Sequence, residues 1–249
     1  MNQTSLKPLK IGGADRVEAI SFRFLPNATP RPFLAKRVLD LILAAMFVAL
    51  LSPLLVVIAL LVKLDSHGPA LFVQKRVGSR RKSRDGRVGW EIRTFDIYKF
   101  RTMVHHADSA LHRTYVEAFV EGNLTGTEDD VAGFKLSDDP RITRIGRLLR
   151  RSSLDELPQL LNVLRGEMSL VGPRPVPIYE VAGYQDRHYQ RFSALPGITG
   201  LWQVRGRGRV NFEEAIRLDV EYTRRQSLWL DLELLLLTIP AVLSGRGAR

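Results

Sequence analysis

One stretch constrains the fold more than any other: residues 41–62 read LILAAMFVALLSPLLVVIALLV, 22 residues without a charge. As a straight helix this segment is roughly 33 Å long, at about 1.5 Å per residue. A bilayer's hydrocarbon core is about 30 Å thick, so the length permits a membrane span without requiring one. The run is too long, and begins too far from the N terminus, to be a signal peptide.

Ser52 and Pro53 lie at the centre of this run. Proline removes a helical donor and disturbs the preceding turn, and a serine hydroxyl can bond a freed carbonyl, so a bend is expected there. Basic residues flank both ends: Arg31, Lys36 and Arg37 before the run, and Lys63, Lys75, Arg76, Arg80, Arg81 and Lys82 after it. The positive-inside rule favours cytoplasmic positions for both ends. We therefore predict a re-entrant helix broken at the Ser-Pro pair, within a membrane segment 31–68; a kinked spanning helix is the alternative.

Composition bounds the rest of the chain. With 249 residues, 45% hydrophobic and 25% charged, it has the make-up of a globular protein. The 37 Lys and Arg against 26 Asp and Glu give a net charge of +11, which favours a polyanionic partner: nucleic acid, an anionic membrane surface or a phosphate-bearing substrate. The absence of cysteine excludes a disulfide framework, a thiolate nucleophile and Cys-ligated zinc.

Residues 1–30 are polar and without periodicity, and are interpreted as a leader. Beyond the membrane segment, short β-branched and aromatic runs around the Asp85-Gly86 turn signal predict a small β element. The strand period of two places Lys99 and Arg101 on one face. The pattern turns helical from Val104 to about Val120 and then acidic, so 104–133 is interpreted as an insertion in a catalytic domain 69–226.

The C-terminal part is predicted to be helical. NFEEAIRLDVEYTRR forms an amphipathic helix on which Asp219 and Tyr222 lie one turn apart. The tail, 227–249, has too short an uncharged run to span a bilayer and carries Trp229, which favours an interfacial helix; packing into the core is the alternative. The expected fold is α/β and mainly helical: a monotopic membrane protein with a re-entrant helix, a small β element and interfacial amphipathic helices.

His105, Asp108 and His112 are spaced to share one helix face. A zinc site of the H-E-x-x-H type requires a close histidine pair and further ligands that are missing here. A solvated helix face is the favoured interpretation.

Arginines dominate the segment that follows. Arg141, Arg144 and Arg147, with Arg150 or Arg151, recur at helical spacing and form a cationic stripe suited to lipid head groups, solvent or substrate. Further on, Arg205, Arg207 and Arg209 form a second basic patch among glycines.

Arg174 stands between two prolines, Pro173 and Pro175. The stretch cannot be helical, and the prolines restrict the backbone on both sides, which suits a guanidinium held ready for a phosphate; a surface loop is the alternative.

The stretch SSLDELPQL, residues 152–160, contains two adjacent carboxylates, Asp155 and Glu156. Ser153 with Glu156 fits a capping box, which would make the pair structural. Pro158 favours a helix that begins at Leu157 or Pro158, so both carboxylates would sit at its N terminus, where amides and dipole keep a carboxylate ionised. An ionised carboxylate can be a nucleophile or a magnesium ligand, and with the arginines nearby the pair suits phosphoryl transfer.

These segments together resemble the monotopic phosphoglycosyl transferases of bacteria, the bacterial sugar transferase family. The similarity rests on KRVLDLI, the Ser52-Pro53 pair, FVQKRVG, FDIYKFRTM, the arginine-rich segment through SSLDELPQL to GPRP, PGITGLWQV and LDVEY. It covers residues 31 to about 243 in the expected order. The leader and the insertion depart from it, and the insertion resembles exopolysaccharide-initiating members.

The resemblance implies a chemistry. Asp155 would attack the β-phosphorus of a UDP-sugar, release UMP and carry the phosphosugar until polyprenol phosphate takes it. Glu156 would bind Mg²⁺, and Lys99, Arg101, Arg150 and Arg174 would neutralise the diphosphate beside Pro173 and Pro175. The resemblance also implies a re-entrant helix, the bacterial inner (cytoplasmic) membrane, and a catalytic domain on its cytoplasmic face.

Two alternatives stay open at this point. One is a one-step, metal-dependent transferase in which Asp155 and Glu156 both bind magnesium. The other is a non-enzymatic basic scaffold anchored to the membrane, with the carboxylates only capping a helix. Few aromatic residues interleave the basic runs, which disfavours nucleic acid; an anionic bilayer is the expected surface, and a homo-oligomer is left open.

Overall fold

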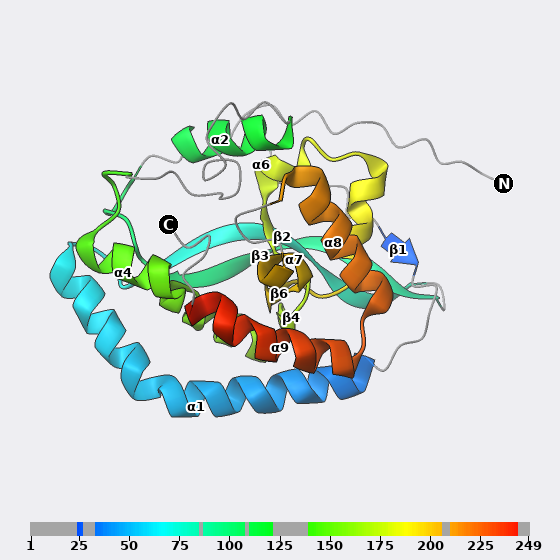
Figure 1. Cartoon of the computed structure of the whole chain (residues 1–249), viewed down its shortest axis with the longest axis horizontal. Helices are drawn as coiled ribbons and strands as arrows, with labels where there is room; N and C mark the ends of the chain where they lie inside the picture. Colours follow the sequence, from blue (N-terminus) through cyan, green and yellow to red (C-terminus); the bar gives the residue numbers. More distant parts are fainter. Residues whose placement is uncertain are drawn as a thin grey trace.

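The computed structural model describes residues 24–26, 33–84, 87–107, 110–121, 139–205 and 210–243. Figure 1 shows a mainly helical body around a small, twisted sheet, with one long helix along its lower edge. The expectation of a mainly helical chain with a small β element is confirmed.

The long helix is α1, Phe33–Asp65, with Pro53 inside it. It bends part-way along its length but stays helical through the proline, so the predicted bend is present without a break in the helix (Figure 1). The Ala49 carbonyl is the one that Pro53 cannot satisfy, because proline has no amide proton. The Ser52 hydroxyl donates to that carbonyl over 2.8 Å.

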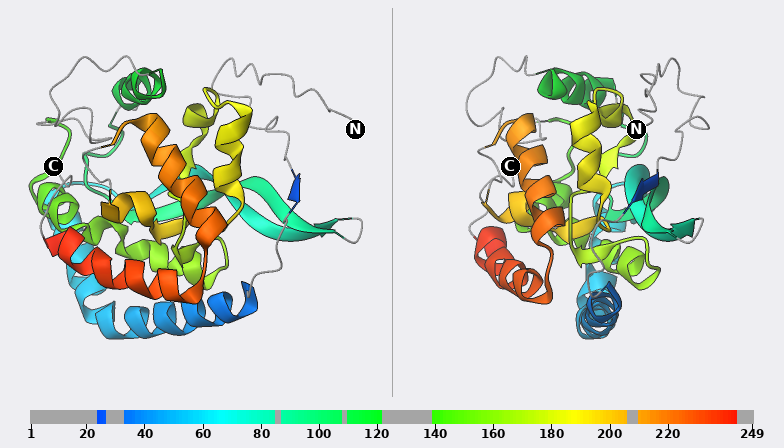
Figure 2. Two further views of the ribbon diagram at one scale, coloured as in Figure 1. Left: turned by 45° about the vertical axis from the view of Figure 1, so that its right-hand side comes forward. Right: turned by 90° about the vertical axis from the view of Figure 1, so that its right-hand side faces the viewer.

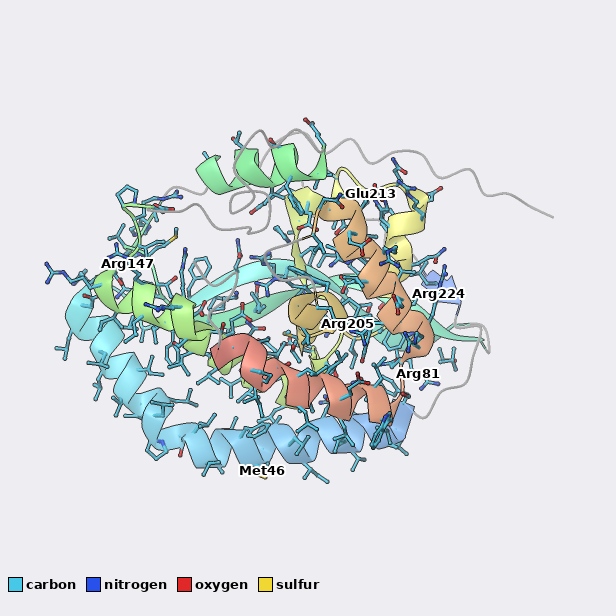
Figure 3. The ribbon with its side chains drawn as sticks, in the orientation of Figure 1. Met46, Arg81, Arg147, Arg205, Glu213 and Arg224 are labelled. Carbon is cyan, nitrogen blue, oxygen red and sulfur yellow. The ribbon has the colours of Figure 1, made fainter. Side chains whose placement is uncertain are left out.

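Both arms of α1 pack on the same body. Asp40 on the first arm accepts from the Leu170 amide over 3.1 Å, and Ile58 and Val62 on the second arm are buried against Phe100. The outer surface of α1 is apolar and exposed, and α1 is the one helix in the described ranges whose length and composition suffice for a membrane span. Met46 points away from the body along this edge (Figure 3).

The sheet is built on one long hairpin, β2 Leu71–Arg84 and β3 Arg87–Phe100. The two strands pair antiparallel, with Phe72 opposite Lys99 and Arg76 opposite Phe95. The strands are longer than the short runs expected from sequence, and the Asp85-Gly86 turn signal lies outside the described residues. β5, Val176–Pro177, adds to the other edge of β2.

A short strand, β1 Phe24–Pro26, pairs with β3 on its outer edge. The sequence-based interpretation of 1–30 as a polar leader did not anticipate it. Three residues carry too little alternation for a strand to be recognised.

The helix expected from Val104 begins later, as α2, Ala110–Val120. The prediction was wrong at this end for two local reasons. The Val104 amide donates to the Arg141 carbonyl over 2.9 Å, and His106 has a positive φ of 62°, which reverses the chain. Most of the interpreted insertion, 122–133, lies outside the described residues.

The remaining elements surround the hairpin. They are α4 Arg144–Ser152, η2 Leu154–Gln159, α5 Leu160–Leu164, β4 Ser169–Val171, α6 Ile178–Val181, η3 Asp186–Phe192, β6 Gly197–Thr199, α7 Leu201–Arg205, α8 Phe212–Arg225 and α9 Leu228–Leu243. β4 and β6 form a separate parallel pair. The largest apolar core includes residues from α1, β3, α5, β4, α7, α8 and α9.

α9 packs into the core on one face and exposes apolar side chains on the other. Leu230 and Leu234 are buried in the core, while Trp229 is 78% exposed and Leu236 68% exposed. Figure 2 shows α9 beside α1 on the same side of the molecule, so their exposed faces form one apolar region.

Candidate active site

Asp155 and Glu156 lie in the first turn of η2. α4 ends at Ser152, and Ser153 adopts a left-handed conformation with φ 56°, which turns the chain into η2. The Ser153 side chain makes no capping hydrogen bond, so the capping-box explanation does not hold. The helix start expected at Leu157 or Pro158 was also wrong: a 3₁₀ turn begins at Leu154, and a proline in such a short turn removes little bonding.

Glu156 is held by two cations from distant segments. Its Oε1 accepts from Lys99 Nζ at 2.9 Å and from Arg174 Nη2 at 3.1 Å. Burial lowers the pKa of Lys99 and the Glu156 charge opposes this, whereas Glu156 raises the pKa of Arg174. The structure thus brings together three residues that the sequence proposed separately.

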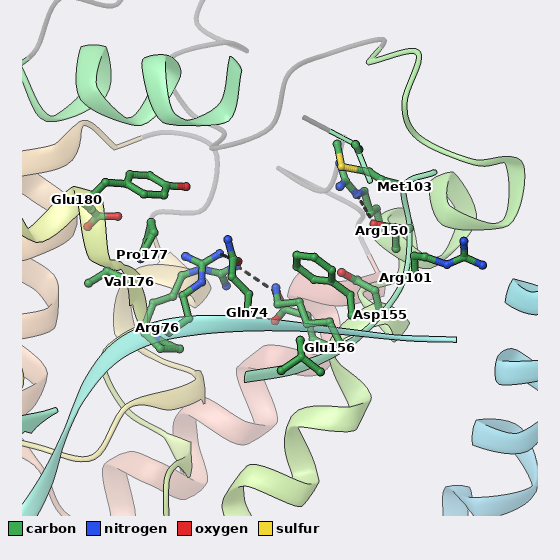
Figure 4. Close-up of a pocket in the computed structure, with 18 of the residues that line it drawn as sticks. Gln74, Arg76, Arg101, Met103, Arg150, Asp155, Glu156, Val176, Pro177 and Glu180 are labelled. Atoms are coloured by element: carbon green, nitrogen blue, oxygen red, sulfur yellow. Dashed lines mark hydrogen bonds and ion pairs between the residues drawn. The ribbon is translucent and has the colours of Figure 1, made fainter. Parts of the chain in front are cut away.

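The pair faces a cavity of about 680 Å³ (Figure 4). Its wall carries four carboxylates, Asp139, Asp155, Glu156 and Glu180, and the following cations: Arg76, Lys99, Arg101, Arg141, Arg150, Arg174 and Arg191. Cations so outnumber carboxylates here that the cavity favours a multiply charged anion.

Arg150 and Arg101 both line the cavity but make different contacts. Arg150 donates through Nε to the Thr102 hydroxyl over 2.9 Å; burial lowers its pKa, and the charge of Asp155 acts in the opposite direction. Arg101 points away from Asp155 and Glu156 (Figure 4). Because β3 ends at Phe100, the predicted strand face does not continue to Arg101.

The guanidinium of Arg101 closes the end of α1. It donates to the Ser66 carbonyl over 2.6 Å, to the Val62 carbonyl over 3.2 Å, and to the carbonyl of His67. Lysine or arginine near a helix C terminus commonly satisfies the last carbonyls in this way.

The segment around Arg174 is non-helical, as predicted. The Pro173 carbonyl accepts from the Gly197 amide over 2.8 Å, and Pro175 lines the cavity. Gly172 packs so tightly that a Cβ there would lie 2.2 Å from the Leu195 carbonyl oxygen.

Sequence reasoning missed the group behind Arg174. Arg191 donates to the Arg174 carbonyl over 3.2 Å, to Glu180 over 3.3 Å, and to the carboxylate of Asp219. All of these acidic and basic side chains are buried, and burial raises the pKa of Asp219 to about 7. The one available signal was the placement of Asp219 on the buried face of the amphipathic helix.

Arg76 was assigned to the flank of the membrane segment but lines the cavity from β2. Burial, together with the charge of Arg174, lowers its pKa to about 10. It shares a strand face with Gln74 and, across the hairpin, with the position of Lys99, a relationship the two-residue period could have indicated.

The other described basic candidates on α4 and α7 lie on the surface. Arg144, Arg147 and Arg151 are exposed on α4 (Figure 3), whereas Arg141 precedes the helix and binds Asp139 through Nη2 at 2.6 Å. Arg205 lies 3.7 Å from Glu233. Arg207 and Arg209 are outside the described residues.

The structure does not test whether the three residues of the disfavoured zinc site share one face. His105 stacks on His106 in the turn before α2, Asp108 lies outside the described residues, and the His112 side chain is not described. Within the ranges that the structure describes, no group of three or more His, Asp or Glu side chains could enclose a metal ion.

The residues present nonetheless fit Mg²⁺ that arrives with a phosphate. Magnesium is commonly held by one or two carboxylates together with substrate phosphates rather than by an all-protein cage. Asp155 and Glu156 supply the two carboxylates, and both lie on the wall of the cavity.

Comparison with known proteins assigns the family. Residues 31–245 match the model of the bacterial sugar transferase family, and the chain belongs to that family. It is 39% identical over 229 residues to the exopolysaccharide production protein ExoY of Rhizobium meliloti, covering 90% of this chain and 94% of that protein.

Two further relatives are longer. The galactosyl transferase CpsE of Streptococcus agalactiae is 42% identical over 218 residues, which are 87% of this chain but 44% of CpsE. A Caulobacter vibrioides protein named UDP-glucose:undecaprenyl-phosphate glucose-1-phosphate transferase is 43% identical over 223 residues, 86% of this chain and 72% of that protein. The chain thus spans less than half the length of CpsE.

Proposed function

We propose that the protein transfers a sugar-1-phosphate from a UDP-sugar to polyprenol phosphate, the first membrane step of exopolysaccharide or glycoconjugate assembly. The observation that carries the proposal is the placement of Asp155 and Glu156 at a cavity lined by buried and partly buried cations. The family, and the Caulobacter vibrioides relative whose name specifies glucose-1-phosphate transfer to undecaprenyl phosphate, support the same substrates.

In the first step, a carboxylate oxygen of Asp155 attacks the β-phosphorus of the donor. The bond from that phosphorus to the oxygen bridging the α-phosphate breaks, and this oxygen leaves with UMP. The sugar phosphate remains on Asp155 as an acyl phosphate. Arg174, Lys99 and Arg150 border the cavity and can neutralise the diphosphate without prior reorganisation.

In the second step, a phosphate oxygen of the polyprenol phosphate attacks the same phosphorus. The bond to Asp155 breaks, which regenerates the carboxylate and leaves polyprenyl diphosphosugar. One small site can thereby treat a soluble donor and a lipid acceptor in turn.

Mg²⁺ bound by Glu156 with the donor would supply further neutralisation of charge on the diphosphate. The one-step alternative requires both carboxylates as metal ligands. In the covalent route Glu156 alone would hold the metal, and Asp155 is the nucleophile.

We further propose that α1 is re-entrant and that the body rests on the cytoplasmic face of the bacterial inner membrane. A helix that crossed the bilayer would carry its second arm away from the body. Both arms of α1 instead contact that body, and the exposed surfaces of α1 and α9 are apolar.

The experiment is an assay of the purified protein in nanodiscs with Mg²⁺, a panel of UDP-sugars and undecaprenyl phosphate. The proposal predicts UMP and a lipid-linked sugar from at least one donor. It also predicts a stoichiometric UMP burst without acceptor. No UMP under either condition would support the scaffold alternative.

A further inference from the structure

A second cavity, of about 380 Å³, adjoins the active site on the side of α1 and α9. Its wall is mostly apolar and is formed chiefly by the following residues: Phe47, Leu51, Leu157, Leu235, Ala241 and Val242. Glu156, Arg174 and Trp202 line both this cavity and the larger one, so the apolar space ends at the proposed reaction centre.

Gln203, in α7, places a polar side chain on the wall of this mostly apolar cavity. The residue is 8% exposed, and neither Nε2 nor Oε1 of its buried amide has a hydrogen-bond partner within the described chain. Leaving such a group unsatisfied costs about 1–3 kcal/mol, so native proteins rarely do so without a reason. A ligand that brings a hydrogen-bond acceptor into the cavity could accept from Nε2.

The surroundings define what that ligand must be. Phe47 and Leu51 reach the cavity from α1, while Met46 and Leu50, beside them on the same helix, are exposed on its outer face. The same division occurs on α9, where Leu235 lines the cavity and Leu236 is exposed. An apolar chain could therefore pass from lipid into the cavity without crossing water.

We propose that this cavity receives the first isoprene units of the acceptor, and that Gln203 hydrogen-bonds the phosphate at their head. The inference rests on the proposed function and extends it, because it assigns the lipid and the nucleotide to different cavities. The phosphate would lie where the cavities meet, at Arg174, and the chain would run between α1 and α9.

The test separates the two half-reactions. Ala241→Trp fills the cavity, and Ile239→Trp places the same ring on the exposed outer face of α9, where Ile239 is 58% exposed. We expect Ala241→Trp to raise the KM for undecaprenyl phosphate at least about tenfold. UMP release without acceptor should stay as in the unaltered protein, and Ile239→Trp should change neither.

Gln203→Leu tests the amide with little change in size. We expect a higher acceptor KM together with an unchanged or higher thermal midpoint, because no internal hydrogen bond is lost. A packing role alone would lower the midpoint and leave the acceptor KM unchanged, which would overturn the assignment of Gln203.

Unchanged acceptor KM in both Ala241→Trp and Gln203→Leu would overturn the proposal. Native mass spectrometry then compares undecaprenyl phosphate with phosphatidylglycerol: equal binding, equally reduced by Ala241→Trp, would mean that the cavity takes ordinary acyl chains. If the unaltered protein transfers nothing to lipid, the proposed function fails, and the same binding comparison still decides what occupies the cavity.

Discussion

The ammonium of Lys36 lies 2.7 Å from the carboxylate of Asp231, joining the start of α1 to α9 across 195 residues of sequence. Both side chains are buried. Lys36 also donates to the Val171 carbonyl over 3.1 Å, and the Tyr222 hydroxyl donates to the same carbonyl over 2.9 Å and to Asp231 over 2.7 Å. The first arm of α1 is therefore joined to β4, the strand that leads directly into Pro173 and Arg174.

Lys36→Met is expected to destabilise the protein by about 3–5 kcal/mol, because it leaves the Asp231 carboxylate buried without its cation. Lys75→Met is the matched control, since Lys75 pairs with Asp96 on the exposed sheet surface and should contribute less than about 1 kcal/mol. Thermal unfolding in one detergent measures both. Equal midpoints for the two variants would mean that the Lys36 contact does not hold the arm.

Arg191→Lys should slow the donor half-reaction. A lysine cannot contact Glu180, Asp219 and the Arg174 carbonyl at once, so Arg174 loses its support. We expect the rate of acceptor-free UMP release per folded molecule to fall about 10- to 100-fold, as for other misplacements of about 1 Å. Arg187→Lys, at an exposed pair with Glu213, should have no effect. A lower thermal midpoint with a normal burst rate would assign Arg191 to folding alone.

Asp219 gives stability an unusual pH dependence. Its carboxylate contacts Arg191, and the charges of Glu180, Tyr184 and Arg174 also interact with this buried group. Two carboxylates share one close arginine, and burial raises the pKa of Asp219 from 3.8 to about 7. As pH rises, the unfolded chain loses the Asp219 proton at about pH 4, whereas the folded protein keeps it until about pH 7. The protonated carboxyl therefore stabilises the fold fully below about pH 4, and this stabilisation is lost as pH rises towards 7.

Between pH 5 and pH 7, the thermal midpoint of the unaltered protein should therefore fall relative to that of Asp219→Asn. The expected difference corresponds to about 2 kcal/mol over that range, at 1.36 kcal/mol per pKa unit. Parallel pH profiles for the two proteins would show that Asp219 is already ionised at pH 5.

Arg101→Gln should affect folding more than donor binding. Its guanidinium satisfies carbonyls at the end of α1, so the thermal midpoint should fall while the KM for the donor changes less than about twofold. Arg174→Gln should instead raise the donor KM more than it lowers the thermal midpoint. A raised donor KM in Arg101→Gln with normal stability would instead support the predicted role of Arg101 in substrate binding.

The sequence predicted the elements whose signals are local. The uncharged run with Ser52 and Pro53 indicated a long bent helix, alternation indicated the hairpin, and Asp155 with Glu156 indicated the centre of the site. The η2 turn escaped prediction because the positive φ of Ser153 depends on how α4 and α5 meet. Arg191 escaped because its partners, Glu180 and Asp219, converge only in three dimensions.

The role of Arg101 shows the same limit. Strand alternation placed it beside Lys99, but β3 ends one residue earlier and the guanidinium turns to the end of α1. The sequence of residues 95–103 does not show that the C-terminal end of α1 lies beside Arg101. Tertiary contacts of this kind decide which groups each of several neighbouring cations binds.

Intact-mass measurement tests directly whether Asp155 carries the phosphosugar. The protein is incubated with Mg²⁺ and the accepted UDP-sugar, without lipid acceptor, beside Asp155→Asn. We predict one added sugar phosphate on the unaltered protein, mapped to Asp155, lost on addition of undecaprenyl phosphate and absent from Asp155→Asn. Turnover with no adduct at any time, or an adduct that persists in Asp155→Asn, would contradict the covalent mechanism.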